Sequence, residues 1–416
     1  MSGRRCLSTG EIELIISSHE KFIAGRPGGK RAVLKFVDLS GANLAGRNLA
    51  DADLSASIFD GARMAGINLE RANLFGCDLR KADLRRAKLA RADLRGACLR
   101  GANLTQADLT QADFRMGQVS MPHPSKGLAA LTHQDRPGEL DNALLIGATL
   151  DGSRMRDTSA FAADFSDCSL KGARMAGANL KDANLSGAIL DGADVANTNF
   201  DGANLSYAVL NGVNMTGARV SGQTNMTGVM SEPTPQAVAK VGDLLARAQS
   251  NHSWCQTGGR EGTPANFDGE DMRPLGDKLA GLRLTAMSAK GANMVSMNLT
   301  GVHLQGANLE NADLRGVCFK SADLRGARLA GANLTKADLR DAVLAPLPLG
   351  NNRETPGSLH KARVRYAMAQ DSDMTNAILD GADVRGCDFT GATMQGASLR
   401  EVDLDTSIGF AADRAA

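Results

Sequence analysis

The large apolar residues recur along this chain with a period of five. Over residues 78–109 a leucine occupies every fifth position, and a small residue, usually alanine, lies two positions before it. Five residues advance an α-helix by about 500°, so successive leucines would spiral around the helix without forming one apolar face. In a flat strand, an odd spacing would place successive leucines on opposite sides of the sheet. The pattern therefore predicts a backbone that turns once per repeat and returns each leucine to a common interior.

A chain that bends in this way forms a solenoid, in which each repeat buries its apolar side only against the coils before and after it. The unit Ala-(Asp/Asn)-Leu-x-x resembles the repeat of the pentapeptide-repeat family, and the resemblance extends over most of the chain. It implies an all-β solenoid, a right-handed quadrilateral β-helix in which four repeats form one coil of about 20 residues. The leucine and the small residue would point inward, and residues one coil apart would stack on one face.

The repeat is interrupted at two places and is preceded twice by a stretch with helical character. Ser8 followed by Glu11 is a capping-box signature, which predicts a short helix over the first coil. Pro122, Pro124 and Pro137 predict an inserted surface loop without regular strand pairing. The expected segments are an N-terminal segment with a capping helix (1–31), a pentapeptide-repeat β-helix (32–115), an inserted Pro-rich loop (116–139), a β-helix (140–230), a linker with a second capping helix (231–265), a β-helix (266–344), a second inserted loop (345–358), a β-helix (359–408) and a tail (409–416).

Two overlays of the sequence on itself indicate an internal duplication. Residues 16–39 can be laid over residues 249–272 with a constant offset of 233 positions, which pairs His19 with His252. A second overlay aligns the stretches that follow the two interruptions. The sequence therefore predicts two tandem copies, each made of a short N-terminal capping helix, a β-helix, a loop and a further β-helix.

Composition and charge narrow the classes of partner and location. The net charge is +1 and aromatic residues make up 4% of the chain, so the chain as a whole is neither a polyanion nor a polycation. Seven cysteines are scattered without a CxxC pair, and Cys77, Cys168 and Cys387 occupy the inward small position, which fits a reducing compartment. Glu11 and Glu13 interrupt an apolar N-terminal stretch, and no run approaches the roughly 18 apolar residues of a membrane span. We therefore expect a soluble, cytoplasmic bacterial protein.

Residues suited to catalysis or metal binding are few and lie apart in the sequence. His252, Trp254 and Cys255 could supply half of a metal site, but the corresponding stretch of the first copy, with His19 and Phe22, contains no cysteine. The aspartates follow the repeat, so pairs of carboxylates carry no catalytic information, and no Ser-His-Asp arrangement or phosphate-binding loop can be assembled. We expect no catalytic, cofactor-binding or metal-binding residues and no enzymatic activity.

One cluster of basic residues interrupts the otherwise balanced charge pattern. Residues 78–100 carry about five more basic than acidic side chains. Such a cluster could bind an acidic protein or nucleic acid, or it could be a solvated face of the solenoid. We predict a non-enzymatic scaffold for protein–protein interaction, whose partner contacts either the loop 116–139 or this basic cluster. The residues of the cluster are Arg80, Lys81, Arg85, Arg86, Lys88, Arg91, Arg95 and Arg100.

The family resemblance implies two alternative functions. Some pentapeptide-repeat proteins mimic the shape and charge of B-DNA and bind type II topoisomerases, which confers resistance to quinolone drugs. Those mimics are strongly acidic and dimerise through a C-terminal helix, whereas this chain is nearly neutral, duplicated and interrupted. Other members are secreted by bacterial pathogens and act on host cells, and the N-terminal sequence argues neither for nor against that role.

Overall fold

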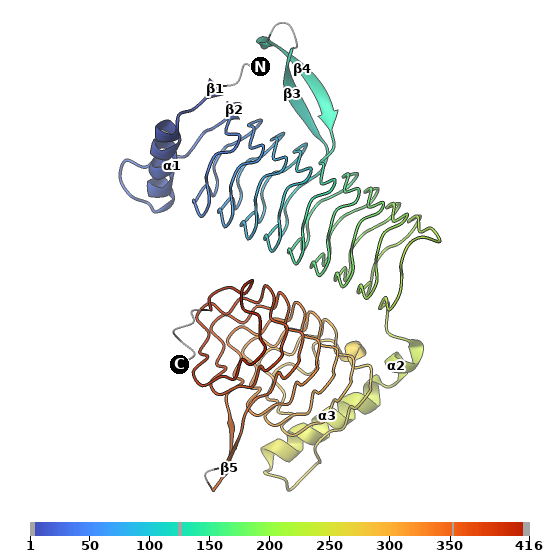
Figure 1. Cartoon of the computed structure of the whole chain (residues 1–416). Helices are drawn as coiled ribbons and strands as arrows, with labels where there is room; N and C mark the ends of the chain where they lie inside the picture. Colours follow the sequence, from blue (N-terminus) through green and yellow to red (C-terminus); the bar gives the residue numbers. More distant parts are fainter. Residues whose placement is uncertain (1–4, 124–126, 352, 411–416) are drawn as a thin grey trace. The chain divides into compact units, whose positions relative to one another are not determined.

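The computed structural model describes residues 5–123, 127–351 and 353–410, and it describes their side chains except for those of 119–133 (Figure 1). The chain divides into two compact units, Met1–Glu232 and Pro233–Ala416. Each unit is a stack of coils with a helix near its start and a two-stranded hairpin that projects from the coils (Figure 1).

Short parallel bridges join residues that lie one coil apart. Asp53, Asn73 and Asp93 are bridged in this way, at a separation of 20 residues from one to the next. The backbone N–H of Leu54 donates to the carbonyl of Asn73 at 2.9 Å, and similar bonds run between the other coils. These ladders satisfy the backbone polar groups, while inward leucines such as Leu94 are fully buried. The interior is therefore a column of leucines separated by small residues.

The backbone turns from one side of the coil to the next at residues in the left-handed conformation. Glycine fills many of these corners, but Lys81, Arg86 and Arg91 also have positive φ angles, of 54°, 58° and 59°. This conformation is unfavourable for a residue with a side chain, and the hydrogen bonds between coils on both sides of each corner hold it in place. These three basic side chains therefore project from corners of the solenoid.

The first interruption is a hairpin and not an irregular loop. Strands β3 (Gly117–His123) and β4 (Gly127–Arg136) pair in an antiparallel manner, with Pro122 opposite Leu131. The prediction that proline would prevent regular pairing here was wrong, because a two-stranded ribbon has two open edges and a proline can lie with its nitrogen toward the open edge. Pro124 lies outside the described residues.

The second interruption is also a hairpin, where a loop was expected. It consists of β5 (Leu347–Gly350) and β6 (Arg353–Thr355). In both units the coils continue on the far side of the hairpin, since Cys98 is bridged to Glu139 and residue 328 to residue 358. The hairpins are thus insertions at a corner that leave the stack unbroken.

Helix α1 (Thr9–Ile23) lies against the first coil of the first unit. The predicted capping box is confirmed, because the Ser8 hydroxyl accepts from the Glu11 N–H and the Glu11 carboxylate accepts from the Ser8 N–H. Ile16 is fully buried within the core cluster of the coils. Strand β1 (Arg5–Cys6) pairs in parallel with β2 (Val37–Asp38), which adds an edge strand to the same coil.

Arg47 occupies a position where the repeat normally has a small inward residue. Its guanidinium points to α1 instead, where it donates to the carboxylates of Glu13 at 2.7 Å and Glu20 at 2.9 Å. The Glu20 carboxylate also accepts from the Asn48 backbone N–H at 3.1 Å. The irregularity in the repeat therefore marks a contact between the helix and the first coil.

The second unit begins with two helices and a short 3₁₀ turn. These are α2 (Pro235–Ala239), α3 (Val241–Gln256) and η1 (Arg273–Leu275). Leu244 and Ala248 of α3 are fully buried in the core cluster of this unit. Helix α3 is thus attached to its coils through an apolar side, as α1 is in the first unit.

The counterpart of His19 in the second unit is Asn251, and the overlay that paired His19 with His252 is wrong by one residue within the helix. The Ala32 N–H donates to His19, and the corresponding N–H of Ala265 donates to Asn251. The difference arises because the helix residues His19 and Asn251 are 232 positions apart, whereas the coil residues Ala32 and Ala265 are 233 positions apart. A constant offset cannot follow both.

Candidate interaction surface

Each side of the solenoid is built by one repeat per coil, so consecutive repeats face different directions. The ladders of bridges that run through Asp78, Asp83, Lys88 and Asp93 are four separate columns. A column is the set of residues at equivalent positions of successive coils, and outside the insertions its members are mostly 20 residues apart. Residues that are neighbours in the sequence therefore lie on different sides, and residues one coil apart lie on the same side.

The predicted basic cluster is consequently distributed around the solenoid. A run of five repeats encircles the coil, so a single basic patch of eight residues does not form on one side. The largest group that shares a side has three members, all next to the Asp78 column. These three are Arg80, Lys81 and Arg100. Arg85 and Arg86 lie next to the Asp83 column, and Lys88 lies in a column of its own. Arg91 projects from the corner that follows Lys88 and lines one groove with Arg95 of the Asp93 column.

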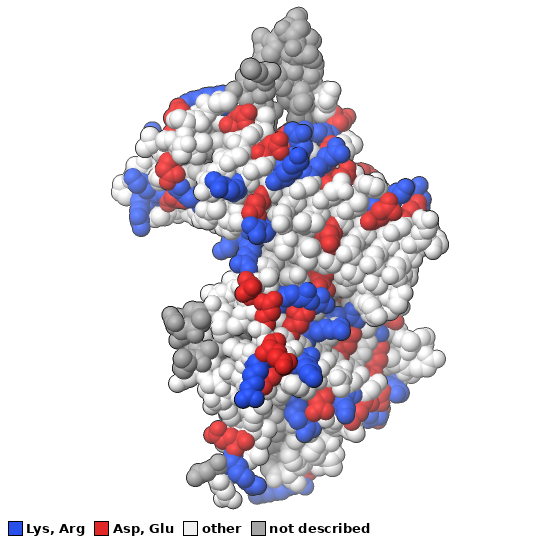
Figure 2. Space-filling model, in the orientation of Figure 1, with Lys and Arg blue, Asp and Glu red and all other residues white. Residues whose placement is uncertain are grey.

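Several of these arginines are neutralised by their own repeat. Arg85 donates to the carboxylate of Asp83, two residues earlier, at 2.7 Å, and the pairs Arg80–Asp78 and Arg95–Asp93 have the same geometry. Hydrogen bonding to Arg85 lowers the pKa of Asp83, although partial burial opposes the shift. Exposed pairs of this kind add at most about 1 kcal/mol to stability. Accordingly, Figure 2 shows basic and acidic side chains intermixed over the visible surface.

One side of the first unit carries a denser set of arginines, which we call the arginine face. Its column runs through Asp93, Asp113, Arg154 and Arg174 and continues to Asp194. A groove of about 710 Å³ lies along it. The charged residues that line this groove are Arg91, Asp93, Arg95, Asp113, Arg115, Arg154 and Arg174.

Some arginines of the arginine face are paired with aspartates, and others are not. Arg115 is bound to Asp113 at 2.7 Å, in the same way as Arg95 is bound to Asp93. Arg154 lies 3.7 Å from the same Asp113 carboxylate. Arg174 is exposed and, within the part of the chain that the structure describes, makes no ion pair. Arg91 donates to the neutral side chain of Gln111, and the next member of the column after Arg174 is Asp194. Among the residues that line the groove, basic side chains therefore outnumber acidic ones.

The sequence places Arg115 one coil after Arg95, but sequence reasoning missed Arg154 and Arg174 as members of the same surface. The hairpin separates Asp113 from Arg154 in the sequence, although the two residues are bridged on adjacent coils. If the residues of the hairpin are left out and the rest are counted in coils of 20, Asp113 and Arg154 fall at equivalent positions of adjacent coils.

The base of the first hairpin lies against the arginine face. The Arg136 guanidinium donates to the carbonyl of Gly96 at 2.5 Å and to that of Gly76 at 3.2 Å. Gly117 leaves no room for a side chain, because a Cβ there would lie 2.8 Å from the Phe75 ring. Arg95 covers that same ring, with its guanidinium carbon 5.4 Å from the ring centre. The hairpin is thus anchored beside the groove.

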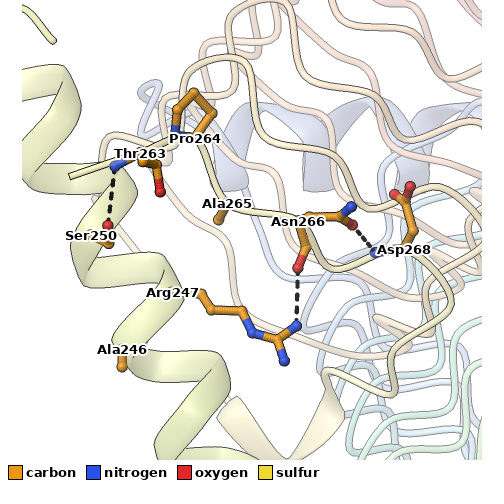
Figure 3. Close-up of a pocket in the computed structure, with 8 residues that line it drawn as sticks. All are labelled: Ala246, Arg247, Ser250, Thr263, Pro264, Ala265, Asn266 and Asp268. Atoms are coloured by element: carbon orange, nitrogen blue, oxygen red, sulfur yellow. Dashed lines mark hydrogen bonds between the residues drawn. The ribbon is translucent and has the colours of Figure 1, made fainter.

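The second unit has two smaller grooves next to α3. The first, of about 670 Å³, lies between α3 and the chain at residues 263–268, where Arg247 donates to the Asn266 carbonyl at 3.1 Å and Ser250 accepts from the Thr263 N–H (Figure 3). The second, of about 320 Å³, is lined by residues that include Cys255 and His303. The polar groups of the first groove bind each other, which fixes the helix to its coil.

Metal-binding and reactive groups do not assemble in the described residues. Among them, no three His, Cys, Asp or Glu side chains lie close enough together to hold a metal ion. The His252 ring accepts from the Arg283 backbone N–H at 3.0 Å, so its Nδ1 atom has a structural partner. Burial raises the pKa of Cys98 to about 11, which disfavours the nucleophilic thiolate at neutral pH.

The sequence model described as "Pentapeptide repeats" matches this chain eight times. The matches together cover more than half of the chain. No curated protein matches it at a significant level. Within the described residues, the helices are all too short or too polar to span a bilayer. The matched stretches are residues 38–76, 67–106, 77–115, 139–177, 178–217, 278–316, 318–345 and 370–405.

Solved structures of several repeat proteins are similar to this chain. HetL, a pentapeptide repeat protein involved in heterocyst differentiation regulation from the cyanobacterium Nostoc sp. strain PCC 7120, is 19% identical, with coverage of 97% of this chain and 98% of that one and a TM-score of 0.22. Rfr23 from the cyanobacterium Cyanothece 51142 is 26% identical over 32% of this chain and 87% of that one, with a TM-score of 0.25. QnrB1, a plasmid-mediated fluoroquinolone resistance protein, is 20% identical over 51% and 97%, with a TM-score of 0.20.

Proposed function

Because this chain belongs to the pentapeptide-repeat family, whose fold is a right-handed β-helix, we propose that it is a non-enzymatic scaffold that binds another protein through its arginine face. The observation that carries the proposal is the excess of basic side chains, including Arg154 and Arg174, over acidic ones in a groove of about 710 Å³. The stacked coils hold these side chains on a rigid surface, so little conformational entropy is lost when a partner binds.

The chemistry of the groove favours an acidic segment of the partner. Arg154 and Arg174 are adjacent members of one column, and like charges at adjacent positions of a ladder repel each other. A carboxylate placed between them would relieve this repulsion and accept charge-assisted hydrogen bonds from both guanidinium groups. The anchored base of the hairpin, next to Phe75 and Arg95, supplies a second element that the partner can contact.

Nucleic acid is a less favourable ligand for this groove. Double-stranded nucleic acid is bound through many phosphate contacts along a basic surface, whereas two of the arginines of this groove, Arg95 and Arg115, are already paired with Asp93 and Asp113. Single-stranded nucleic acid is bound largely by stacking on aromatic side chains, but Arg95 covers the Phe75 ring. The balanced charge also disfavours mimicry of DNA toward a type II topoisomerase, which requires a strongly acidic surface.

The proposal includes two tandem copies, each closed by a helix at its N-terminal end. His19 of α1 and Asn251 of α3 accept equivalent backbone N–H groups, which supports a common origin. A side chain on Gly138 would collide with the carbonyl of Phe114, and the same clash exists in the second unit, where the chain re-enters the coil after its hairpin. We propose that the two copies follow the segments expected from the sequence, with a hairpin in place of each loop.

We further propose that this scaffold acts in the cytoplasm. The support comes from the sequence, whose scattered cysteines fit a reducing compartment. The secreted-effector alternative would be favoured if the protein were recovered from the culture medium of intact cells.

A fluorescent oligoglutamate peptide tests the arginine face directly. The variant Arg154→Asn with Arg174→Asn removes both charges and keeps residues that fit the ladder, since Asn179 occupies the same kind of position. The matched control, Lys81→Asn with Arg100→Ser, removes two positive charges from another side. We expect anisotropy titrations to show at least a tenfold loss of peptide affinity in the first variant and little loss in the control.

Two results would contradict the proposal. Equal peptide affinities of both variants would show that the arginine face is not the binding surface. A duplex DNA probe of the same charge that binds more tightly than the peptide would assign the groove to nucleic acid instead.

A further inference from the structure

The first coil of a solenoid has backbone groups with no preceding coil to bond them, and in the first unit α1 supplies the partners. The His19 ring is fully buried at this junction. Its Nε2 atom lies 2.9 Å from the Ala50 carbonyl oxygen, and its Nδ1 atom lies 3.0 Å from the Ala32 nitrogen. The Glu20 carboxylate bonds the Asn48 N–H beside it. Side chains of α1 thus replace the missing coil.

These two hydrogen bonds determine the protonation state of His19. A carbonyl oxygen can only accept, so Nε2 carries the proton, and a backbone N–H can only donate, so Nδ1 must be unprotonated. The neutral imidazole is therefore the form that fits. An imidazolium ring would direct a second N–H at the Ala32 N–H and would leave a charge in a site closed to water.

We infer that His19 makes the attachment of α1 to the first coil sensitive to pH, so that mild acid releases the helix and uncovers the edge of the coil. The released state solvates the imidazolium, whereas the attached state excludes it. Release also exposes the apolar side of α1, including Ile16, and an open strand edge of the kind that pairs with other chains.

The charged groups around His19 do not reverse this effect. Burial lowers the pKa of His19, and the nearby Arg31 acts in the same direction. The hydrogen bond to Ala50 and the carboxylates of Asp51 and Glu20 raise it, but the balance stays below the ordinary value. Glu20 is itself held by Arg47, which keeps its pKa below the usual range.

Mild acid therefore changes the charge of His19 and not that of the carboxylates. The hydrogen bond to Arg71 keeps the pKa of Asp51 below its ordinary value as well, so Asp51 and Glu20 stay charged at pH 5.5. The Arg47 bridge to Glu20 accordingly persists in the pH range in which the released histidine is protonated.

The sign and size of the effect follow from proton linkage. Above the ordinary histidine pKa of about 6.5, both states of His19 are neutral and the attachment is at full strength. As the pH falls below that value, the released state binds a proton that the attached state does not. The equilibrium then shifts toward release by about tenfold for each pH unit, until the lowered pKa of the attached state is reached.

The second unit provides a natural comparison. Asn251 is also fully buried, donates to the Thr285 carbonyl at 3.1 Å and accepts from the Ala265 N–H at 2.9 Å. It thus makes the same two bonds with a group that does not titrate. The half-exposed His252 next to it accepts from the Arg283 N–H, so it must be removed from the comparison by substitution.

Hydrogen exchange read by mass spectrometry tests the inference on the full chain. The protection factor of residues 9–23, corrected for the intrinsic pH dependence of exchange, should fall about fivefold between pH 6.5 and pH 5.5 in the unmodified protein, because the released histidine is already half protonated at pH 6.5. The His19→Asn variant, which installs the residue of the second unit, should show no such fall. An unchanged pH dependence in His19→Asn, or none in the unmodified protein, would overturn the inference.

The reciprocal variant decides the matter if His19→Asn fails to hold α1 at any pH. In Asn251→His combined with His252→Asn, protection of residues 241–256 should become sensitive to the same pH step. The single variant His252→Asn is the control and should be insensitive. Protection in the combined variant that does not change with pH would also overturn the inference.

Discussion

Replacement of Leu94 by alanine tests whether the interior is a rigid column. Leu94 is fully buried, and Leu74 and Phe114, which are also fully buried, lie one coil before and after it. The substitution removes three carbon atoms, and at about 0.8 kcal/mol for each the lost burial is about 2.4 kcal/mol. A cavity adds to this cost when the surroundings cannot collapse.

The backbone ladders fix the spacing between coils, so the cavity at Leu94 should stay open. We therefore expect Leu94→Ala to lower the free energy of unfolding by about 4 kcal/mol, in the upper part of the 2–5 kcal/mol range for such changes. The matched control is Met215→Ala, at an inward position that is only half-buried, for which we expect about 1–2 kcal/mol.

Urea unfolding followed by far-UV circular dichroism measures both variants. With a slope of about 2–3 kcal/mol per molar urea, the Leu94 variant should unfold at roughly 1–2 M less urea than the unmodified protein. Equal midpoints for Leu94→Ala and Met215→Ala would refute the reasoning, because they would show that the coils close around a missing side chain.

Two other predictions concern single contacts. Arg47→Ala should weaken the attachment of α1 by about 1 kcal/mol, since it removes bridges to Glu13 and Glu20, and faster amide exchange in α1 would show this. Exchange as slow as in the unmodified protein would contradict it. Among the thiols, exposed Cys6 should react with a maleimide in the folded protein, whereas Cys98, with its raised pKa, should react only after unfolding. Mass spectrometry of digested samples checks this, and equal labelling of both would contradict the described burial.

The sequence was sufficient to interpret residues that occupy the same position in every repeat and residues whose hydrogen-bond partners lie nearby in the chain. Leu79 and Leu94 occupy the same position of the repeat, and both are fully buried. The capping box at Ser8 could be recognised because its two bonds connect residues within one helical turn. Local rules of this kind suffice where the partner of each group lies at a fixed distance along the chain.

The features that were missed depend on partners at irregular distances. Pro122 suggested a loop, but the hairpin stands outside the stack, where an open edge tolerates proline. His19 was paired with His252 by a constant offset, yet the bond from Ala32 shows that Asn251 is its counterpart. Arg47 stands out in the sequence as an exception to the repeat near the expected cap, but its partners Glu13 and Glu20 belong to α1, and no periodicity within the coils can reveal them.

The basic cluster shows how a solenoid changes the meaning of proximity in a sequence. Arg80, Arg85 and Arg95 are close in the chain, but they belong to three different columns, and each is paired with an aspartate of its own repeat. Arg154 and Arg174 are separated by a full coil, yet they are adjacent on one column. A run of charge along this chain therefore encircles the coil and gives no surface of one sign. A surface that binds a partner must run along the stack, and it has to be found by counting coils, with the length of each hairpin left out of the count.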